Sequence, residues 1–387
     1  MKDNFLVYHF SVGREGGVHT VIKNLILYSK NDLLSHRVIY LINNDIQSNL
    51  KFNKSIDYKI FTYSKFENLY FILKKIKTFI QDRNVILACH DWLELALISN
   101  LGLQYPVVFF MHGEYPYYFE TAKLNESFIN KFISPTLSIK AKLDALLPHR
   151  KRDIIYQPFP VYNLNLKPET YHHINCAFYV CDLNDTNKNF SILPRIDERL
   201  RARGYFINWH IGGGGLSQSE FLQKWSLVND TRVKYYGFLD IELLKILISA
   251  SNVFILPSFN EGMQISLIES MQSGLVPIVN NWGNSVTELI ENGINGFIVD
   301  GNDLDSYVDI IVSLNDDAEK FKKISDSAKL TTLNINEPYS CVEKIESVFK
   351  YIKDIETKRV PKKNYGSRLD NPYIPTLVTN SISGGDG

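Results

Sequence analysis

Short apolar runs alternate with segments of helical spacing along almost the whole chain. In the first half, runs of strand length lie at residues 5–10, 37–42, 85–89, 107–111 and 131–134. The second half repeats the pattern at residues 176–181, 206–211, 233–236, 253–257, 277–280 and 296–299. Strands that alternate with helices form parallel sheets with helices on both faces. The sequence therefore predicts an α/β protein with two such sheets.

The length of the chain calls for two domains, because 387 residues exceed one ordinary core and suit two α/β domains of about 150 to 200 residues. Pro158 and Pro160 disfavour a helix in the segment 156–163, which suits an extended connector. Ligands of open parallel sheets bind beyond the carboxyl ends of the strands, so two facing sheets would enclose a deep cleft. We expect domains at 1–160 and 161–340, a C-terminal helix at 341–356 that crosses back to the first domain, and a tail at 357–387 that is disordered, loosely docked or an interaction arm.

Composition excludes several classes of function. Lys plus Arg and Asp plus Glu both total 42, so no net charge attracts nucleic acid, and we expect no nucleic-acid partner. The cysteines at 89, 176, 181 and 341 fit neither a zinc-site spacing nor a disulfide framework. No apolar stretch approaches the roughly 18 residues of a membrane span, and the N-terminus lacks the pattern of a secretory signal. These features favour a cytoplasmic protein.

Residues 70–80 leave peripheral contact with a membrane open. The segment combines apolar residues with Lys74, Lys75 and Lys77, as a basic amphipathic helix on a membrane surface would. The same apolar residues also suit packing against the first sheet, with the lysines in solvent. Both alternatives fit the sequence.

Gly16 and Gly17 follow the first predicted strand and precede a predicted helix. Free backbone N–H groups and the positive end of the helix dipole attract an anion at such a junction. Residues without side chains allow a diphosphate to approach closely. We expect a phosphate contact here, and the alternative is a plain tight turn.

Glu261 and Glu269 lie eight residues apart across a predicted strand, loop and helix. On one continuous helix they would differ by about 80° in direction, so they do not simply line one face. With Glu261 in the loop, its carboxylate can accept hydrogen bonds from sugar hydroxyls, while Glu269 accepts from ribose hydroxyls. The amides at the helix start, those of Gly262, Met263, Gln264 and Ile265, suit phosphate oxygens. In the alternative interpretation Glu261 caps the helix and Glu269 is a solvated carboxylate.

Taken together, Gly16-Gly17 and the regions 257–269, 273–279 and 288–296 resemble the GT-B glycosyltransferases of family 4. The resemblance extends over residues 5–355 and is strongest from 233 to 300. It implies the GT-B fold, in which two Rossmann-like domains face each other across a cleft. The first domain would hold the acceptor and the second a nucleoside diphosphate sugar, with UDP or GDP as the nucleotide. The resemblance further implies transfer with retention, no cofactor and no required metal ion.

The resemblance assigns roles to further residues. His112, at the end of a buried strand, matches a histidine that points toward the donor sugar, and the alternative is a satisfied core histidine. Lys188 aligns with a lysine that binds the diphosphate, although exposed lysines are common. His90 and Asp91 end the preceding strand and would border the acceptor side.

One departure from the family concerns the charge beside the diphosphate. Asp182 occupies a position where relatives carry an arginine, and a carboxylate there is adverse by about 1 kcal/mol or more at close range. Arg14 would offer a replacement cation from the other wall. Alternatively, the loop is shifted and Asp182 faces solvent, or turnover is weakened. Gly212 begins a run of four glycines that we expect to form a loop near the nucleotide base or a plain turn.

Asn284, Ser285 and Glu288 follow another strand end and are further candidates for the donor pocket, with a helix cap as the alternative for Ser285. The sequence as a whole predicts a retaining glycosyltransferase in which Glu261 and His112 orient the donor sugar. The acceptor would be a glycan, a lipid-linked glycan or a small molecule, in bacterial surface-polysaccharide or glycoconjugate assembly. The rival is a non-catalytic GT-B protein that binds a nucleotide-sugar or a partner enzyme. An epimerase of this fold would need additional acid–base carboxylates and histidines, and a phosphorylase would need a pyridoxal lysine. Neither pattern is visible in this sequence.

Overall fold

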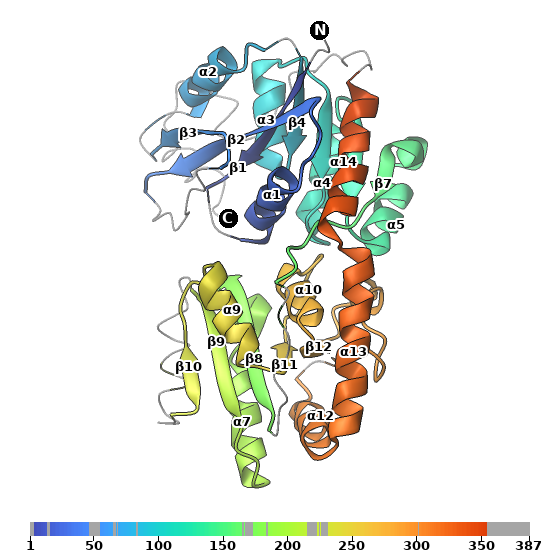
Figure 1. Ribbon diagram of the computed structural model, residues 1–387. Coiled ribbons are helices and arrows are strands. Elements are labelled where there is room, and N and C mark those ends of the chain that lie inside the picture. The colour runs from blue at the N-terminus through green and yellow to red at the C-terminus, as the bar shows by residue number, and fades with distance from the viewer. Residues whose placement is uncertain are drawn as a thin grey trace. The chain divides into compact units, whose positions relative to one another are not determined.

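The chain forms two compact units in the computed structural model (Figure 1). The structure describes residues 4–13, 16–45, 55–64, 67, 69–82, 84–164, 166, 173–182, 185–214, 223, 225, 231–300 and 302–353. Met1–Phe159 and the chain from Tyr339 onward belong to the first domain, and Pro160–Pro338 form the second. The chain leaves the first domain inside the proline-containing connector. The tail at 357–387 lies outside the described residues.

A seven-stranded parallel sheet forms the centre of the first domain. Its strands, in order across the sheet, are β3 (Tyr58–Tyr63), β2 (Leu34–Asn43), β1 (Phe5–Ser11), β4 (Val85–Cys89), β5 (Val107–Phe110), β6 (Lys131–Ser134) and β7 (Ile154–Tyr156). The chain runs outward from β1 to β3 and then continues on the other side of β1 with β4. The strand order therefore reverses between β1 and β4, which is where ligands of doubly wound sheets bind.

Helices cover both faces of this sheet (Figure 1). They are α1 (Gly17–Leu27), α2 (Leu69–Phe79), α3 (Trp92–Leu101), α4 (Pro116–Asn125), α5 (Leu137–Leu146), the 3-10 helix η1 (Pro148–Asp153) and α14 (Pro338–Ile352). Alternate residues of a strand point to opposite faces. Tyr8 and Phe10 of β1 accordingly join the core beneath α2 and α3, whereas His9 contacts Phe349 of α14 on the other face.

All five strands predicted for the first half are present, and two further strands were not predicted. β3 is an edge strand with several exposed or half-buried residues, so it lacks the continuous apolar run of a strand buried on both faces. β7 has only three residues. Both lie at sheet edges, where the hydrophobic signal is weakest.

Helix α2 contains the segment that left membrane contact open. Its apolar residues Ile72, Leu73 and Ile76 are buried in the core of the first domain. The exposed side chains include Lys74, Lys75 and Lys77. This arrangement is that of a surface helix packed on its own sheet. Within the described parts of the chain, no helix is long and apolar enough to cross a membrane.

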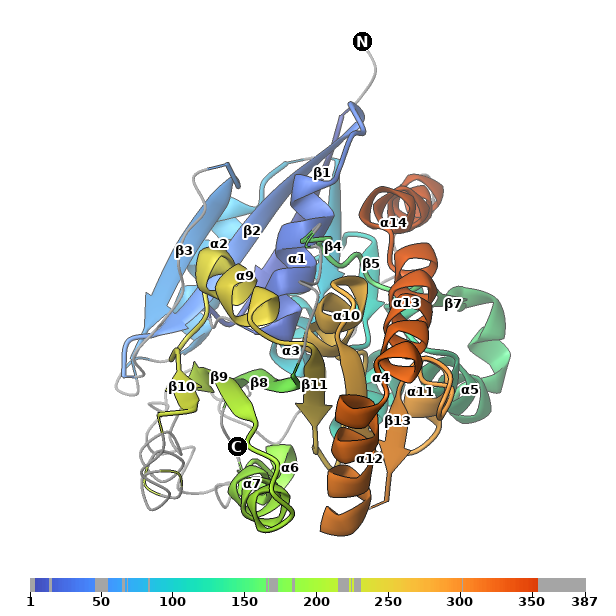
Figure 2. The same cartoon turned by 60° about the horizontal axis from the view of Figure 1, so that its bottom comes forward.

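The second domain repeats the same architecture with six parallel strands (Figure 2). Across the sheet they are β10 (Val233–Tyr235), β9 (Asn208–Gly214), β8 (Asn175–Asp182), β11 (Val253–Leu256), β12 (Val276–Asn280) and β13 (Phe297–Val299). The helices with described bounds are α6 (Asp185–Lys188), α7 (Ile192–Ala202), α9 (Ile241–Ser249), α10 (Ile265–Gln272), α11 (Asn284–Thr287), α12 (Leu304–Asp316) and α13 (Ala318–Ile335). The order reverses between β8 and β11. All six predicted strands are present.

The glycine run corrects one expectation. Gly212 and Gly214 lie inside β9 rather than in a loop after it. A Cβ atom on Gly212 would lie 2.5 Å from Leu239 Cδ1, and one on Gly214 would lie 2.4 Å from two ring atoms of Phe238. The glycines therefore let the side chains of Leu239 and Phe238 pack closely against the strand, and a larger residue would require these side chains to move. Consecutive glycines looked like a turn because close packing across a sheet leaves no mark in the local sequence.

The second domain contains a fully buried carboxylate, Asp197 of α7. Its oxygens accept hydrogen bonds from Trp209 Nε1 at 2.8 Å and from a guanidinium nitrogen of Arg232 at 3.3 Å. Asp197 thus ties α7 to β9 and to the segment before β10.

We predict that Asp197→Ala lowers the free energy of unfolding of the second domain by about 3 kcal/mol or more, because it leaves the Arg232 charge and the Trp209 N–H without their partner. Equilibrium unfolding in urea, followed by tryptophan fluorescence, measures this change. Glu198→Gln, at an exposed position on the same helix, is the matched control and should change stability by about 0.5 kcal/mol or less. Equal effects of the two substitutions would contradict the prediction.

Candidate functional site

An ion pair joins the segments that follow β8 and β11, the two strands on either side of the reversal point of the second sheet. Lys188 ends α6, directly after β8, and Glu261 lies in the loop after β11. Lys188 Nζ is 2.6 Å from Glu261 Oε1, and the two side chains are 17% and 6% exposed. Two residues that the sequence predicted separately therefore contact each other directly at the place where a ligand is expected.

The loops that carry this pair are held together by hydrogen bonds of two asparagines, Asn187 and Asn189. Asn187 accepts hydrogen bonds from the backbone N–H of Phe259 through its carbonyl oxygen at 2.8 Å and from that of Asn260 through Oδ1 at 3.1 Å. Asn189 adopts a left-handed conformation, with φ of 50°, and donates from Nδ2 to Asn302 Oδ1 at 2.8 Å. These contacts fix the position of Lys188 relative to Glu261.

Helix α10 begins just after Glu261 and leaves its first turn open. Gln264 is the N-cap, makes no side-chain cap hydrogen bond, and is followed by a first turn without acidic residues. The interpretation of Glu261 as the helix cap is therefore wrong. The amides at 262–265 lie at the positive end of α10, an arrangement that suits an anion.

Glu269 lies further along α10, in a half-buried position beside Tyr179 of β8. The Tyr179 hydroxyl donates to the carbonyl oxygen of Ser266 at 2.8 Å. Burial raises the pKa of Tyr179 well above its ordinary value, and the nearby charge of Glu269 raises it further. Tyr179 therefore stays a neutral donor that holds β8 against α10.

Buried polar atoms without partners mark the carboxyl ends of β11 and β12. Ser258 Oγ, Asn280 Oδ1 and Ser285 Oγ are buried and have no hydrogen-bond partner among the described residues. Buried polar groups are rarely left unpaired, so such a cluster indicates a place where a ligand or water binds. Ser258 and Asn280 were not predicted as site residues, although each is a polar residue at the end of an apolar strand.

The candidates after β12 occupy the short helix α11. Asn284 is exposed, Ser285 is buried and Glu288 is half-buried at the C-terminal end. Gly283, rather than Ser285, is the N-cap. The alternative role of Ser285 as a helix cap is therefore wrong, and its hydroxyl remains available in the described structure.

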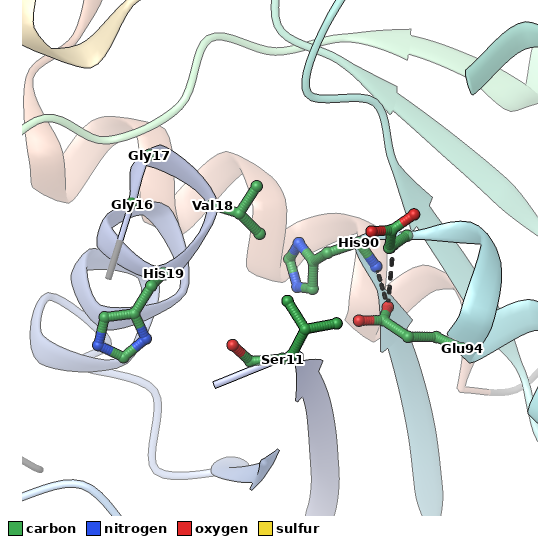
Figure 3. Close-up of a pocket in the computed structure, with 9 residues that line it drawn as sticks. Ser11, Gly16, Gly17, Val18, His19, His90 and Glu94 are labelled. Atoms are coloured by element: carbon green, nitrogen blue, oxygen red, sulfur yellow. Dashed lines mark hydrogen bonds between the residues drawn. The ribbon is translucent and has the colours of Figure 1, made fainter. Parts of the chain in front are cut away.

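A small pocket of about 160 Å³ lies at the reversal point of the first sheet (Figure 3). Gly16 and Gly17 at the start of α1 line one side, and His90 and Glu94 line the other. Asp91 also lines the pocket. No side chain caps α1, and its first turn has no acidic residue. The start of α1 therefore faces this pocket without a capping side chain, and the phosphate contact at Gly16 and Gly17 stays a prediction.

Asp91 and His90 are already engaged with their own domain. The Asp91 carboxylate accepts from the backbone N–H of Trp92 at 2.6 Å, and Glu94 completes a capping box at the start of α3. His90 is buried, and both its ring nitrogens contact other histidines, Nε2 facing His9 and Nδ1 facing His112. Neither nitrogen of His90 is left for a ligand.

His112 keeps one nitrogen for other contacts. Its Nε2 lies 2.9 Å from His90 Nδ1, and Nδ1 has no hydrogen-bond partner among the described residues. Burial lowers the pKa of His112 to about 3, so the ring is neutral at physiological pH. Nε2 of His112 is thus engaged with His90, and Nδ1 can contact a ligand.

Two candidates cannot be placed. Arg14 lies outside the described residues, and so does the side chain of Asp182, although its backbone ends β8. Over the described parts of the chain, no three side chains of His, Cys, Asp or Glu converge on a point that would hold a metal ion.

The Lys188–Glu261 pair makes a testable contribution to stability. In a double-mutant cycle with Lys188→Met and Glu261→Gln, we predict a coupling free energy of about 1–3 kcal/mol, because each single substitution leaves the other group poorly solvated and without a partner. Urea unfolding of the wild type, the two single variants and the double variant provides the value. Additive effects of the two substitutions would show that the pair is not formed in solution.

Comparisons with known proteins fit this geometry. Residues 175–331 match the family model described as "Glycosyl transferases group 1". The UDP-Gal:alpha-D-GlcNAc-diphosphoundecaprenol alpha-1,3-galactosyltransferase of Escherichia coli is 33% identical over 102 residues, 24% of this chain and 26% of that protein. The O-antigen chain mannosyltransferase B of E. coli is 36% identical over 99 residues, 24% of this chain and 25% of that protein. The matched stretch spans about a quarter of the length of these curated relatives.

A solved structure, that of Anabaena Alr3699/HepE in complex with UDP-glucose, covers 90% of this chain and 100% of its own. The TM-score is 0.72 at 14% identity, so this similarity concerns the fold. It includes both parallel-sheet domains. The chain thus has the GT-B fold, and its residues 175–331 are similar to the glycosyl transferases group 1.

Proposed function

We propose that this protein is a retaining glycosyltransferase that moves a sugar from a nucleoside diphosphate sugar to a glycan, lipid-linked or small-molecule acceptor. The observation that carries the proposal is the Lys188–Glu261 pair at the reversal point of the second sheet, next to the open start of α10. The cation of Lys188 and the amides at the start of α10 suit the diphosphate of such a donor. The carboxylate of Glu261 suits the hydroxyl groups of its sugar.

Donor binding would exchange the partner of Lys188. The diphosphate carries more negative charge than one carboxylate and can also use the amides of α10, so it competes for Lys188 Nζ. Glu261, released from its 2.6 Å contact, then accepts hydrogen bonds from the sugar hydroxyls. Positive potential from Lys188 and the helix start stabilises the departing diphosphate, the role that a metal ion fills in other transferases.

The nucleoside would lie along α10. Glu269 accepts hydrogen bonds from the two ribose hydroxyls. UDP is the preferred nucleotide, because one relative named above uses UDP-Gal and a structural neighbour is a complex with UDP-glucose.

The first domain would supply the acceptor side. Gly16 and Gly17 contribute amides to the phosphate, and His112 contacts the donor sugar. The names of both E. coli relatives refer to glycan assembly, which supports a role in bacterial surface-polysaccharide assembly with the acceptor at the inner face of the membrane. A non-catalytic nucleotide-sugar-binding protein is the alternative. It is favoured by the aspartate at position 182, where the family that the sequence resembles carries an arginine.

The first test separates an enzyme from a binding protein. Purified protein is incubated with UDP- and GDP-sugars and an extract of lipid-linked glycans, and released nucleoside diphosphate is measured. We predict release with a UDP-sugar and its loss in Glu261→Ala, which should still bind UDP. No release with any donor would favour the binding protein, and full turnover by Glu261→Ala would remove that residue from the site.

The second test concerns the ribose. Glu269→Ala should weaken UDP binding by about 1–3 kcal/mol, because two hydrogen bonds to a charged acceptor are lost. Isothermal titration calorimetry measures this difference, with Glu319→Ala at an exposed position of α13 as the control. Equal affinities of the Glu269 variant and the wild type would contradict the assignment.

A further inference from the structure

Four histidines form a continuous hydrogen-bonded chain across the first sheet, which we call the histidine ladder. Its members come from four neighbouring strands or their ends, β2, β1, β4 and β5, and are His36, His9, His90 and His112. The distances are 3.0 Å from His36 Nδ1 to His9 Nε2, 3.2 Å from His9 Nδ1 to His90 Nε2, and 2.9 Å from His90 Nδ1 to His112 Nε2. The two inner rings, His9 and His90, therefore each use Nδ1 toward one neighbouring ring and Nε2 toward the other.

The strand register explains this arrangement. Val7 is level with His36, so His9 lies two residues further toward the carboxyl edge of the sheet. On β4, Ala88 is level with His9, and His90 again lies two residues further. The pairing of Cys89 with Phe109 extends the same diagonal to His112. Residues two apart share a face of the sheet, so the four rings lie on one face.

The ladder begins at a carboxylate on α14. His36 Nε2 lies 3.5 Å from Glu346 Oε1, at the outer limit of a hydrogen bond, and the two side chains are 3% and 6% exposed. His36 Nε2 is buried and has no hydrogen-bond partner among the described residues, so Glu346 at 3.5 Å acts on it through its charge. Phe349, one turn further along α14, covers the rings of His9 and His36. Helix α14 therefore closes this end of the ladder from solvent.

The carboxylate decides the direction of every hydrogen bond. In neutral imidazole, one nitrogen donates and the other accepts. A neighbouring anion favours a proton on His36 Nε2, because a lone pair there would face a negative charge. Nδ1 of His36 then accepts from His9 Nε2, His9 Nδ1 accepts from His90 Nε2, and His90 Nδ1 accepts from His112 Nε2. Without the carboxylate, the opposite direction would be equally well bonded inside the ladder.

The two inner rings and the carboxylate have the charge states that this direction needs. Burial lowers the pKa of His9 and His90 well below the ordinary value, and neighbouring histidines lower it further. Burial alone would raise the pKa of Glu346, but the neighbouring His36 ring and the hydrogen bond from the Ser29 hydroxyl lower it overall. The interior rings are therefore neutral while the carboxylate is ionised.

We propose that Glu346 acts through the histidine ladder as a positioning residue that keeps Nδ1 of His112 unprotonated. His112 is then a hydrogen-bond acceptor toward any ligand. Of the four rings it is the one with a nitrogen left over, since His9 and His90 are bonded at both nitrogens and His36 faces Glu346.

This direction predicts the chemistry of the ligand group at His112, an inference that rests on the proposed function. An acceptor nitrogen pairs with a hydroxyl that donates its proton. It disfavours a carboxylate, which only accepts, and a deoxy position, which leaves the nitrogen unpaired. The ladder would therefore select a donor sugar with a free hydroxyl at this position over its uronic acid or deoxy counterpart.

The tautomers can be measured without any ligand. Long-range ¹H–¹⁵N correlation spectra of the ¹⁵N-histidine-labelled full-length protein distinguish Nε2–H from Nδ1–H rings, and His112→Gln identifies the His112 signals. The spectra are recorded near pH 8, where imidazole groups are ordinarily neutral. We expect His112 in the Nε2–H form, and a His112 ring that is Nδ1–H, doubly protonated or an equal mixture would overturn the proposal.

Glu346→Gln tests the role of the carboxylate. The amide has a similar shape but can donate as well as accept, so the ladder loses its fixed direction, and the His112 signals should move toward the Nδ1–H form. Glu343→Gln, at an exposed position of the same helix, should leave them unchanged. Unchanged signals in Glu346→Gln would overturn the proposal. The wild-type spectrum still decides the tautomer if that variant does not fold.

Turnover provides a second readout. With a UDP-hexose and the corresponding UDP-uronate or deoxy analogue as competing donors, Glu346→Gln should reduce the preference for the hydroxylated sugar by about tenfold or more, while Glu343→Gln keeps it. Loss of all turnover in the wild type, together with the expected tautomer, would count against the proposed function and not against the ladder. An unchanged preference in an active Glu346→Gln variant would contradict the selection of the sugar by His112.

Discussion

The ion pair between Lys188 and Glu261 is the contact on which the interpretation of the second domain depends. Both groups are largely removed from water, and each satisfies the charge of the other at 2.6 Å. A buried charge without a partner is costly, so neither residue can change its contacts unless a new partner arrives. An anionic, hydroxylated ligand supplies partners for both.

The two domains share one topology but treat the reversal point differently. In the second domain the strands on either side are joined by opposite charges. In the first, β1 and β4 are joined by the neutral rings of His9 and His90, because burial disfavours the imidazolium form. Charge suits a site that binds and releases a charged group. Neutral rings suit a site that must keep one hydrogen-bond direction, which a single distant carboxylate can set.

The fold was largely predictable from the sequence, because strands buried on both faces appear as continuous apolar runs. The edge strands β3 and β7 lack such runs, and the glycines of β9 looked like a turn. Glu261 and Lys188 were identified as single residues, but their contact joins positions 73 residues apart. The histidine ladder was missed because His9 and His36 are single polar residues inside strands. Only the register of four strands and the packing of α14 bring them into line with His90 and Glu346.

If a diphosphate replaces Glu261 as the partner of Lys188, substitutions of Lys188 and of Glu261 should change the affinity for UDP in opposite directions. Calorimetric titration of UDP into the wild type, Lys188→Met and Glu261→Gln tests it most directly, because UDP lacks the sugar that Glu261 would contact. If the diphosphate displaces Glu261 from Lys188, Glu261→Gln should bind UDP more tightly than the wild type and Lys188→Met more weakly. Weaker binding by both variants, or an unchanged affinity in Lys188→Met, would contradict the exchange.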